Sequence, residues 1–265
     1  EYRSDVKPSG TKDLGEGDDP LVAFSPNNNF YYLPGKCLEL DFGERSRTMM
    51  PYHEEPARAT GNDRFSSHID KEDWYETVKL NYGIDYLNGG SKHFDPLPDT
   101  WIRMRDILLF WASKGIDGFR CDMAEMVPVK FWEWAIPQIR ERHSVLFIAE
   151  IYRPELYESY LQAGFDYLYD KVGMYDCLRD VVCGRRPANA ITYCWQSVDD
   201  IKDHMLYFLE NHDEQRIASD FFCGNALKAV PALIVGALLQ KNPFMLYAGQ
   251  EFGERGMDAE GFSGR

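Results

Sequence analysis

The sequence predicts an α/β fold in which parallel strands and helices alternate as they do in a closed β/α barrel. From residue 99 onward, short continuous apolar runs alternate with helical patterns, as in parallel strands that are covered on both faces. Every run that can be placed ends in a polar or charged residue, and the carboxyl ends of barrel strands converge on one face. No GxGxxG or P-loop motif follows a strand, which disfavours an open sheet with a nucleotide site.

Two domains are expected, an irregular one over residues 1–98 and the barrel portion over residues 99–265. The first stretch has no sustained hydrophobic period and is dense in turn formers, as at 15–20, 26–29 and 88–91. It is also too rich in aromatic residues for a disordered linker. Two interpretations stay open, because these aromatic residues either line a ligand site or pack on one another.

The elements of the second domain are predicted from apolar periods and capping residues. Asp99 can cap a helix that runs to Lys114, and Gly115 ends it. The apolar stripe of this helix is Trp101, Met104, Leu108 and Trp111. Pro128 begins a second helix. Its inward residues are expected to be Phe131, Trp132, Ala135, Ile136 and Ile139.

The remaining elements follow in the same alternation. Strands are expected over 116–121, 145–149, 165–169, 205–209 and 244–248. Helices are expected over 153–162, 174–182 and 225–240. The last of these is apolar nearly all round, which predicts a buried helix.

The composition favours a globular protein and excludes several partners. With 44% hydrophobic and 14% aromatic residues, the chain of 265 residues can bury a large core. A net charge of −14 without any basic run argues against a nucleic-acid partner. No apolar run approaches the roughly 20 residues of a membrane span. Six cysteines without a CxxC pair or zinc-ligand spacing leave the compartment open.

Three predicted strand ends carry carboxylates that would meet on one face of a barrel, namely Asp122, Glu150 and Asp213. Each one alone is explained by a structural ion pair, but together they favour a catalytic site. Two carboxylates that flank a glycosidic bond are what retaining hydrolysis requires, one as nucleophile and one as acid and base. Arg120 would keep Asp122 ionised, and burial behind its strand would raise the pKa of Glu150.

At these residues the chain resembles the α-amylase family, glycoside hydrolase family 13. Residues 118–122, Gly-Phe-Arg-Cys-Asp, are similar to its second conserved segment, and residues 147–150, Phe-Ile-Ala-Glu, to its third. Residues 208–216, Phe-Leu-Glu-Asn-His-Asp-Glu-Gln-Arg, are similar to its fourth. The resemblance implies Asp122 as nucleophile and Glu150 as general acid and base. It also implies that His212 and Asp213 bind sugar hydroxyls and that Asp213 stabilises the transition state.

The chain also departs from the family pattern. The first conserved segment, Asp-x-x-x-Asn-His, is not found, and about five of eight strands can be placed. The expected fold is therefore a partial (β/α)8 TIM barrel, about strands 4 to 8, preceded by a domain-B-like insertion. We expect a central piece of a longer enzyme, truncated at both ends, whose open sheet edges favour self-association. Residues 123–126, Met-Ala-Glu-Met, stand where many starch-cleaving members have x-x-Lys-His.

The expected substrate is an α-linked oligosaccharide or polysaccharide. The alternatives are a carbohydrate-binding relative without catalysis, or an excised fragment that is inactive in isolation. Trp74, Tyr82 and Tyr152 could stack on sugar rings, although each could equally belong to the core. No cofactor is required by this chemistry. The family's calcium site draws on the segment that is not found, so a Ca2+ ion and its ligands stay unknown. The resemblance alone favours an extracellular or periplasmic setting.

Overall fold

The computed structural model describes residues 12–41 and 52–256. The chain divides into two compact units, residues 1–111 and 112–265. The division falls at the end of helix α1 (Asp99–Ala112), whereas the expected domain boundary lies at the start of the same helix. The domain assignment stays a prediction.

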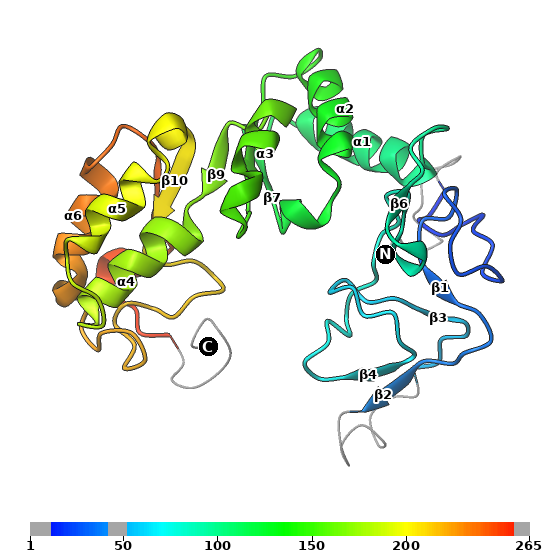
Figure 1. Cartoon of the computed structure of the whole chain (residues 1–265), viewed down its shortest axis with the longest axis horizontal. Helices are drawn as coiled ribbons and strands as arrows, with labels where there is room; N and C mark the ends of the chain where they lie inside the picture. Colours follow the sequence, from blue (N-terminus) through cyan, green and yellow to red (C-terminus); the bar gives the residue numbers. More distant parts are fainter. Residues whose placement is uncertain (1–11, 42–51, 257–265) are drawn as a thin grey trace. The chain divides into compact units, whose positions relative to one another are not determined.

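Residues 12–41 and 52–111 of the first unit form three small two-stranded sheets rather than one large sheet (Figure 1). β1 (Tyr32–Leu33) pairs with β3 (Ala57–Arg58), and β5 (Ile84–Asp85) with β6 (Ser91–Lys92), both antiparallel. β2 (Glu39–Asp41) and β4 (His68–Asp70) run parallel. A 3-10 turn, Tyr86–Asn88, follows β5. Most of this unit is therefore held by turns, side-chain hydrogen bonds and ring packing.

Aromatic residues form much of the core of this unit. The ring of Tyr31 is 1% exposed and contacts the rings of Phe24, Phe65 and Tyr86 at centroid distances of 5.3–6.1 Å. The Tyr31 hydroxyl donates to the carbonyl of Ile84 at 2.7 Å. For these aromatic residues, packing on one another describes the structure better than an open ligand surface does.

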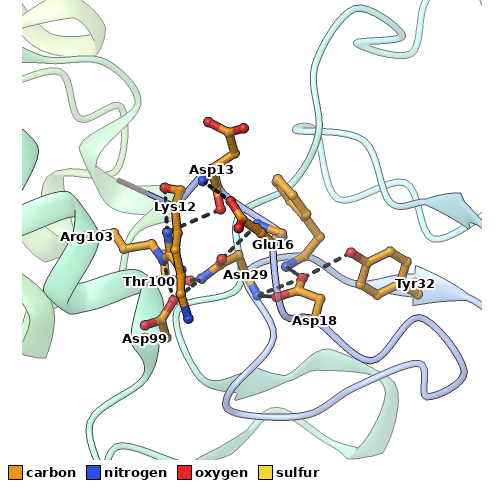
Figure 2. A network of polar contacts seen from close by, with 11 residues as sticks. Lys12, Asp13, Glu16, Asp18, Asn29, Tyr32, Asp99, Thr100 and Arg103 are labelled. Atoms are coloured by element: carbon orange, nitrogen blue, oxygen red, sulfur yellow. Dashed lines mark hydrogen bonds and ion pairs between the residues drawn. The ribbon is translucent and has the colours of Figure 1, made fainter. Parts of the chain in front are cut away.

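The buried Asn29 ties the beginning of the chain to helix α1 (Figure 2). Its Nδ2 donates to Asp99 Oδ2 at 3.0 Å and to Thr100 Oγ1 at 3.2 Å, in the first turn of α1. Its backbone N–H donates to the carboxylate of Asp18 at 2.8 and 2.9 Å. One buried side chain thus joins segments about 70 residues apart in sequence, which the hydrophobic pattern alone does not predict.

Helix α1 departs from its predicted apolar stripe at the C-terminal end. Trp101 is buried and its Nε1 donates to the carbonyl of Tyr82 at 3.1 Å. Trp111 is 53% exposed, so its predicted inward position is wrong. At 3.6 residues per turn, Ala112 lies almost in line with Trp101, whereas Trp111 is rotated to the side. Ala112 is accordingly the buried residue at this end.

The second unit contains one parallel sheet of five strands. The strands are β7 (Gly118–Cys121), β8 (Leu146–Ala149), β9 (Tyr167–Tyr169), β10 (Met205–Phe208) and β11 (Phe244–Met245). Their order in the sheet follows the sequence, and every neighbouring pair is parallel. This arrangement is part of a (β/α)8 barrel, as predicted. β7 and β11 are the edges of the sheet.

Helices alternate with these strands. They are α2 (Val129–Arg140), α3 (Tyr157–Ala163), α4 (Asp176–Val182), α5 (Ala190–Gln196) and α6 (Val230–Leu238). All five predicted inward residues of α2 are buried, and Pro128 is its N-cap. A π-helical turn, Lys171–Tyr175, leads into α4. Helix α5 was not predicted, because its short sequence has no clear apolar period.

The predicted burial of the helix over 225–240 is wrong. The segment forms a 3-10 turn, Ala226–Ala229, followed by α6. Ala232 and Gly236 are buried, but Leu227, Ile234 and Leu238 are 76%, 53% and 75% exposed. Helix α6 contacts β10 and α4, which cover one side of it. None of the helices in the described part of the chain is long and apolar enough to span a bilayer.

Candidate active site

The site begins at the carboxyl end of β7, where Arg120 and Asp122 lie. Arg120 is on the strand, and Asp122 follows its last residue. An Arg120 Nη1–Asp122 Oδ1 contact joins the two side chains. The Asp122 side chain is 71% exposed, whereas Arg120 is largely buried. The cation is therefore fixed by the fold, and the carboxylate beside it is open to solvent.

Glu150 lies next to this pair because of the strand register. Cys121 pairs with Ala149 across β7 and β8, so that the residues that follow, Asp122 and Glu150, emerge side by side. Arg120 Nη2 lies 2.8 Å from Glu150 Oε1, and the Glu150 side chain is 2% exposed. One guanidinium thus holds both predicted catalytic carboxylates, and not Asp122 alone as expected from the sequence.

Two further donors fix the carboxylate of Glu150. The Tyr152 hydroxyl donates to Oε1 at 2.7 Å, and the backbone N–H of Met123 donates to Oε2 at 2.9 Å. Met123 has φ +40° and ψ +48°, the left-handed backbone conformation that residues other than glycine rarely adopt. The left-handed turn after Asp122 thus includes the backbone N–H that contacts Glu150. Strained turns are frequent at functional sites.

Tyr169 on β9 completes the surroundings of Arg120. The Arg120 guanidinium carbon lies 5.5 Å from the centroid of the Tyr169 ring, and Nε approaches the Tyr169 hydroxyl at 3.4 Å. Although burial opposes it, hydrogen bonds with Tyr169 and Asp122 and the charge of Glu150 raise the pKa of Arg120 above its ordinary value. Arg120 is therefore a permanent cation between the two carboxylates.

The end of β10 supplies His212 and Asp213. His212 Nε2 lies 3.3 Å from Asp213 Oδ2, and both side chains are about half exposed, at 55% and 42%. The buried Asn211 accepts the backbone N–H groups of Asp213 and Glu214 at 3.0 and 2.8 Å and so fixes the turn. Burial, the hydrogen bond with Glu150 and the charges of Glu150, Asp213 and Glu214 raise the pKa of Tyr152. The end of β10 thus acts electrostatically on the residue that holds Glu150.

Sequence reasoning missed the cation Lys171 in the π-helical turn after β9. Lys171 Nζ lies 3.2 Å from Asp176 Oδ1 and 3.3 Å from Glu214 Oε1, and 6.0 Å from the centroid of the Tyr152 ring. Glu214 also accepts the hydroxyl of Tyr175 at 3.1 Å. Glu214 lies within residues 208–216, which resemble the fourth conserved segment of the α-amylase family. That resemblance could have indicated Glu214 as a site residue. Nothing in the sequence pointed to Lys171.

Glu125 occupies the stretch where many starch-cleaving relatives have Lys-His. Its carboxylate accepts the backbone N–H of Arg153 at 3.1 Å and lies 3.3 Å from Arg153 Nε. The Glu125 side chain is 10% exposed. It therefore binds the loop after β8 and holds the segment that carries Tyr152.

The other predicted binding residues lie in the first unit. Trp74 is 39% exposed, and Tyr82 is 8% exposed beside Trp101. Their roles with sugar stay predictions. Over residues 12–41 and 52–256, no group of three or more His, Cys, Asp or Glu side chains is arranged to hold a metal ion.

The fold defines the class: a portion of a β/α barrel with two carboxylates at adjacent strand ends. The α-amylase MalA of Haloarcula japonica is 35% identical over 196 residues, which are 71% of this chain and 28% of that protein. The α-1,4-glucan:maltose-1-phosphate maltosyltransferase of Pseudomonas aeruginosa is 37% identical over 142 residues, 51% of this chain and 20% of that protein.

The solved structure of an α-amylase from Lactobacillus plantarum matches with a TM-score of 0.55 and 28% identity, over 69% of this chain and 43% of that one. No protein-family model matches the chain. The chain belongs to the α-amylase family and corresponds to a central part of its catalytic domain. It spans less than a third of the length of the two curated relatives.

Proposed function

We propose that the full-length protein cleaves α-glycosidic bonds of α-glucans or maltooligosaccharides by double displacement with retention of configuration. The observation that carries this proposal is the single arginine that holds an exposed carboxylate and a buried one at adjacent strand ends. Asp122 is the nucleophile, and Glu150 is the general acid and base. The membership of the α-amylase family supports the same assignment.

The two carboxylates divide the reaction between them. The exposed Asp122 attacks the anomeric carbon, while Glu150 gives its proton to the leaving oxygen. In the second step Glu150 removes a proton from the incoming hydroxyl, which attacks the same carbon and releases Asp122. Tyr152 and the Met123 N–H keep the Glu150 carboxylate in one position through both steps.

The remaining predicted residues bind the sugar. Asp213 stabilises the positive charge that develops on the sugar ring, and His212 binds a hydroxyl group. Tyr152 provides an apolar face for a sugar ring. Trp74, which is 39% exposed, offers such a face on the first unit by itself, whereas Tyr82 is 8% exposed and packs beside Trp101. These roles rest on the resemblance and on the position of His212 and Asp213 at a strand end of the same sheet.

Transfer to a sugar acceptor is the second candidate reaction. Several relatives are named maltosyltransferases that use maltose 1-phosphate, and one of them is 37% identical over 142 residues. The two reactions share the first displacement and differ in whether water or a sugar hydroxyl attacks in the second. Product analysis with maltooligosaccharides, with and without maltose 1-phosphate as donor, separates them.

Substitution of the carboxylates in the full-length protein tests the proposal. Asp122→Asn and Glu150→Gln should each lower kcat on maltooligosaccharides by about a thousandfold, since covalent and acid catalysis are each worth at least two orders of magnitude. Glu150→Gln should retain far more activity on α-maltosyl fluoride, whose leaving group needs no proton. The matched control is Asp117→Asn. Asp117 is exposed and lies just before the first residue of β7, at the other end of the strand from Asp122.

Two outcomes would contradict the assignment. A loss below about tenfold in either variant would remove the residue from the chemistry. Calorimetric binding of maltooligosaccharides by the full-length protein without any turnover would favour a carbohydrate-binding relative instead. Circular dichroism of each variant separates a catalytic loss from unfolding.

Two further proposals concern partners and ions. We propose that the isolated chain self-associates through the edges β7 and β11, because unpaired strand edges pair readily; a monomer at high concentration in sedimentation velocity would exclude this. We also propose that catalysis needs no cofactor and that Ca2+ acts on stability alone, if it binds. Activity that is lost with EDTA and restored by CaCl2, with the fold unchanged, would overturn that view.

A further inference from the structure

Glu214, the neighbour of the proposed transition-state stabiliser Asp213, is held by three donors. Lys171 Nζ lies 3.3 Å from Glu214 Oε1. The Tyr175 hydroxyl donates to Oε2 at 3.1 Å, and Arg179 Nη1 lies 3.8 Å from the same oxygen. The Glu214 side chain is 15% exposed, and its carboxylate is occupied by these contacts within the fold. Glu214 therefore anchors the turn that carries Asp213.

All three donors come from the segment that follows β9. Lys171 and Tyr175 are the two ends of the π-helical turn, and Arg179 lies on α4. The buried Asp170 holds this turn, because its Oδ1 accepts the backbone N–H of Met174 at 2.9 Å. π-Helical turns are rare in proteins and occur frequently at functional sites. This turn directs two of its side chains to one carboxylate at the end of the neighbouring strand β10.

Lys171 also reaches the strand end that carries the proposed general acid. Its Nζ lies 6.0 Å from the centroid of the Tyr152 ring, and the Tyr152 hydroxyl donates to Glu150 at 2.7 Å. A further contact of 3.2 Å with Asp176 Oδ1 fixes the ammonium group, and the Lys171 side chain is 20% exposed. One largely buried cation therefore lies among residues that follow β8, β9 and β10.

We propose that Lys171 is a positioning residue, which acts through Glu214 to hold Asp213 where it stabilises the transition state. This inference rests on the proposed function, since it needs the role of Asp213 in the reaction. Asp213 has an anchor on each side, because Asn211 accepts its backbone N–H at 3.0 Å and Glu214 follows it in the chain. A displacement of about 1 Å in a catalytic group costs about a hundredfold in rate, so the loss of one anchor has a measurable effect.

Kinetics of the full-length protein on maltooligosaccharides test the proposal. Lys171→Met removes the charge but keeps an unbranched side chain, and we expect kcat to fall about thirtyfold with little change in KM. Lys171→Arg, which keeps the cation, should lie closer to the wild type than to Lys171→Met. The matched control is Lys202→Met, which should keep the wild-type kcat. Lys202 Nζ lies 2.6 Å from Asp199 Oδ1 in the 3-10 turn Asp199–His204, which precedes β10 and so lies at its other end.

A double variant and a second substrate separate positioning from a general loss of structure. Glu214→Gln removes the same contact from its other side and should lower kcat to a similar degree. Lys171→Met combined with Glu214→Gln should lose about as much as either single variant, because all three remove one anchor. On α-maltosyl fluoride the loss in Lys171→Met should persist, since Asp213 acts on the sugar ring whichever group leaves.

Three results would contradict this role of Lys171. An unchanged kcat in Lys171→Met, with activity still lost in Asp122→Asn, would remove the positioning role and leave the proposed function standing. Losses that multiply in the double variant would show that Lys171 and Glu214 act independently. A loss that disappears on α-maltosyl fluoride would assign Lys171 to Tyr152 and Glu150 instead. An unchanged kcat in Asp122→Asn would contradict the proposed function, and this inference with it.

Discussion

Two arginine–glutamate pairs stand at strand ends of the same parallel sheet, and their surroundings differ. At β7 and β8, Arg120 bridges the buried Glu150 and the exposed Asp122. After β10, Arg216 Nε lies 3.0 Å from Glu210 Oε2, and both side chains are almost fully buried, at 7% and 1% exposure.

The further contacts of the second pair are with the backbone of its own unit. Glu210 accepts the backbone N–H of Ile217 at 2.7 Å, and Arg216 donates to the carbonyl of Ala248 at 3.0 Å. The first pair has a third member, Asp122, that the fold leaves exposed. Residue types at strand ends therefore do not separate the structural pair from the proposed catalytic one, and the two sites differ in the exposure of one carboxylate.

Substitution of the structural pair should give the largest loss of stability. Glu210→Gln leaves Arg216 buried without its counter-ion and should cost about 4 kcal/mol of unfolding free energy. Chemical denaturation measures this cost. The control is Glu251→Gln at an exposed glutamate.

The comparison between the two pairs would fail if Glu210→Gln changed kcat of the folded protein by more than about tenfold. It would also fail if the unfolding free energy stayed within about 1 kcal/mol of the wild type. The first result would give Glu210 a catalytic role, and the second would leave the pair without a structural one.

Asp170 after β9 should make stability depend on pH. Burial, only partly offset by hydrogen bonds from Met174 and Gly173, raises the pKa of its carboxyl to about 6. Because the folded-state value lies above the unfolded one, this group contributes stability below about pH 4 that is lost as the pH rises through about 6. The loss should be about 3 kcal/mol and should be absent in Asp170→Asn.

Unfolding free energies at pH 4, 5, 6 and 7 compare Asp170→Asn with the wild type. Asp203→Asn, at an exposed aspartate, is the control that should keep the wild-type profile. Parallel profiles for Asp170→Asn and the wild type would show that the Asp170 carboxyl does not titrate in this range.

Removal of the Tyr152 hydroxyl should give the smallest effect. Tyr152→Phe keeps the ring but removes the hydrogen bond to Glu150, and should lower kcat about tenfold with little change in KM. Tyr193→Phe, at a 76% exposed tyrosine, is the control. A raised KM with an unchanged kcat would instead assign Tyr152 to sugar binding alone.

Much of the fold could be predicted from the sequence, because most strands are apolar runs and the alternation with helices is regular. The five inward residues of α2 were predicted from the apolar period of a helix. The exposure of residues 225–240 was not predicted, because the burial of a helix depends on how many neighbours cover it and not on its own composition. The role of Asn29 depends on a contact distant in sequence, which no local pattern carries.

The candidate site was predictable to a similar degree. Arg120, Asp122 and Glu150 come together because β7 and β8 pair with Cys121 opposite Ala149. The motifs at 118–122 and 147–150 predicted these two strand ends. The left-handed Met123 and the cation Lys171 were not foreseen. A conformation with positive φ at methionine has no sequence signal, and the partners of Lys171 come from another strand end.

The strand that delivers Arg120 and Asp122 is an edge of its sheet in the part of the chain that the structure describes. A segment that pairs with β7 would lie beside Asp122, the proposed nucleophile. Under the proposed function, chemistry and selectivity would then be divided between separate pieces of polypeptide. Exchange of the segment that covers β7 would alter which glucan chains are accepted, while the carboxylates that follow β7 and β8 stayed the same.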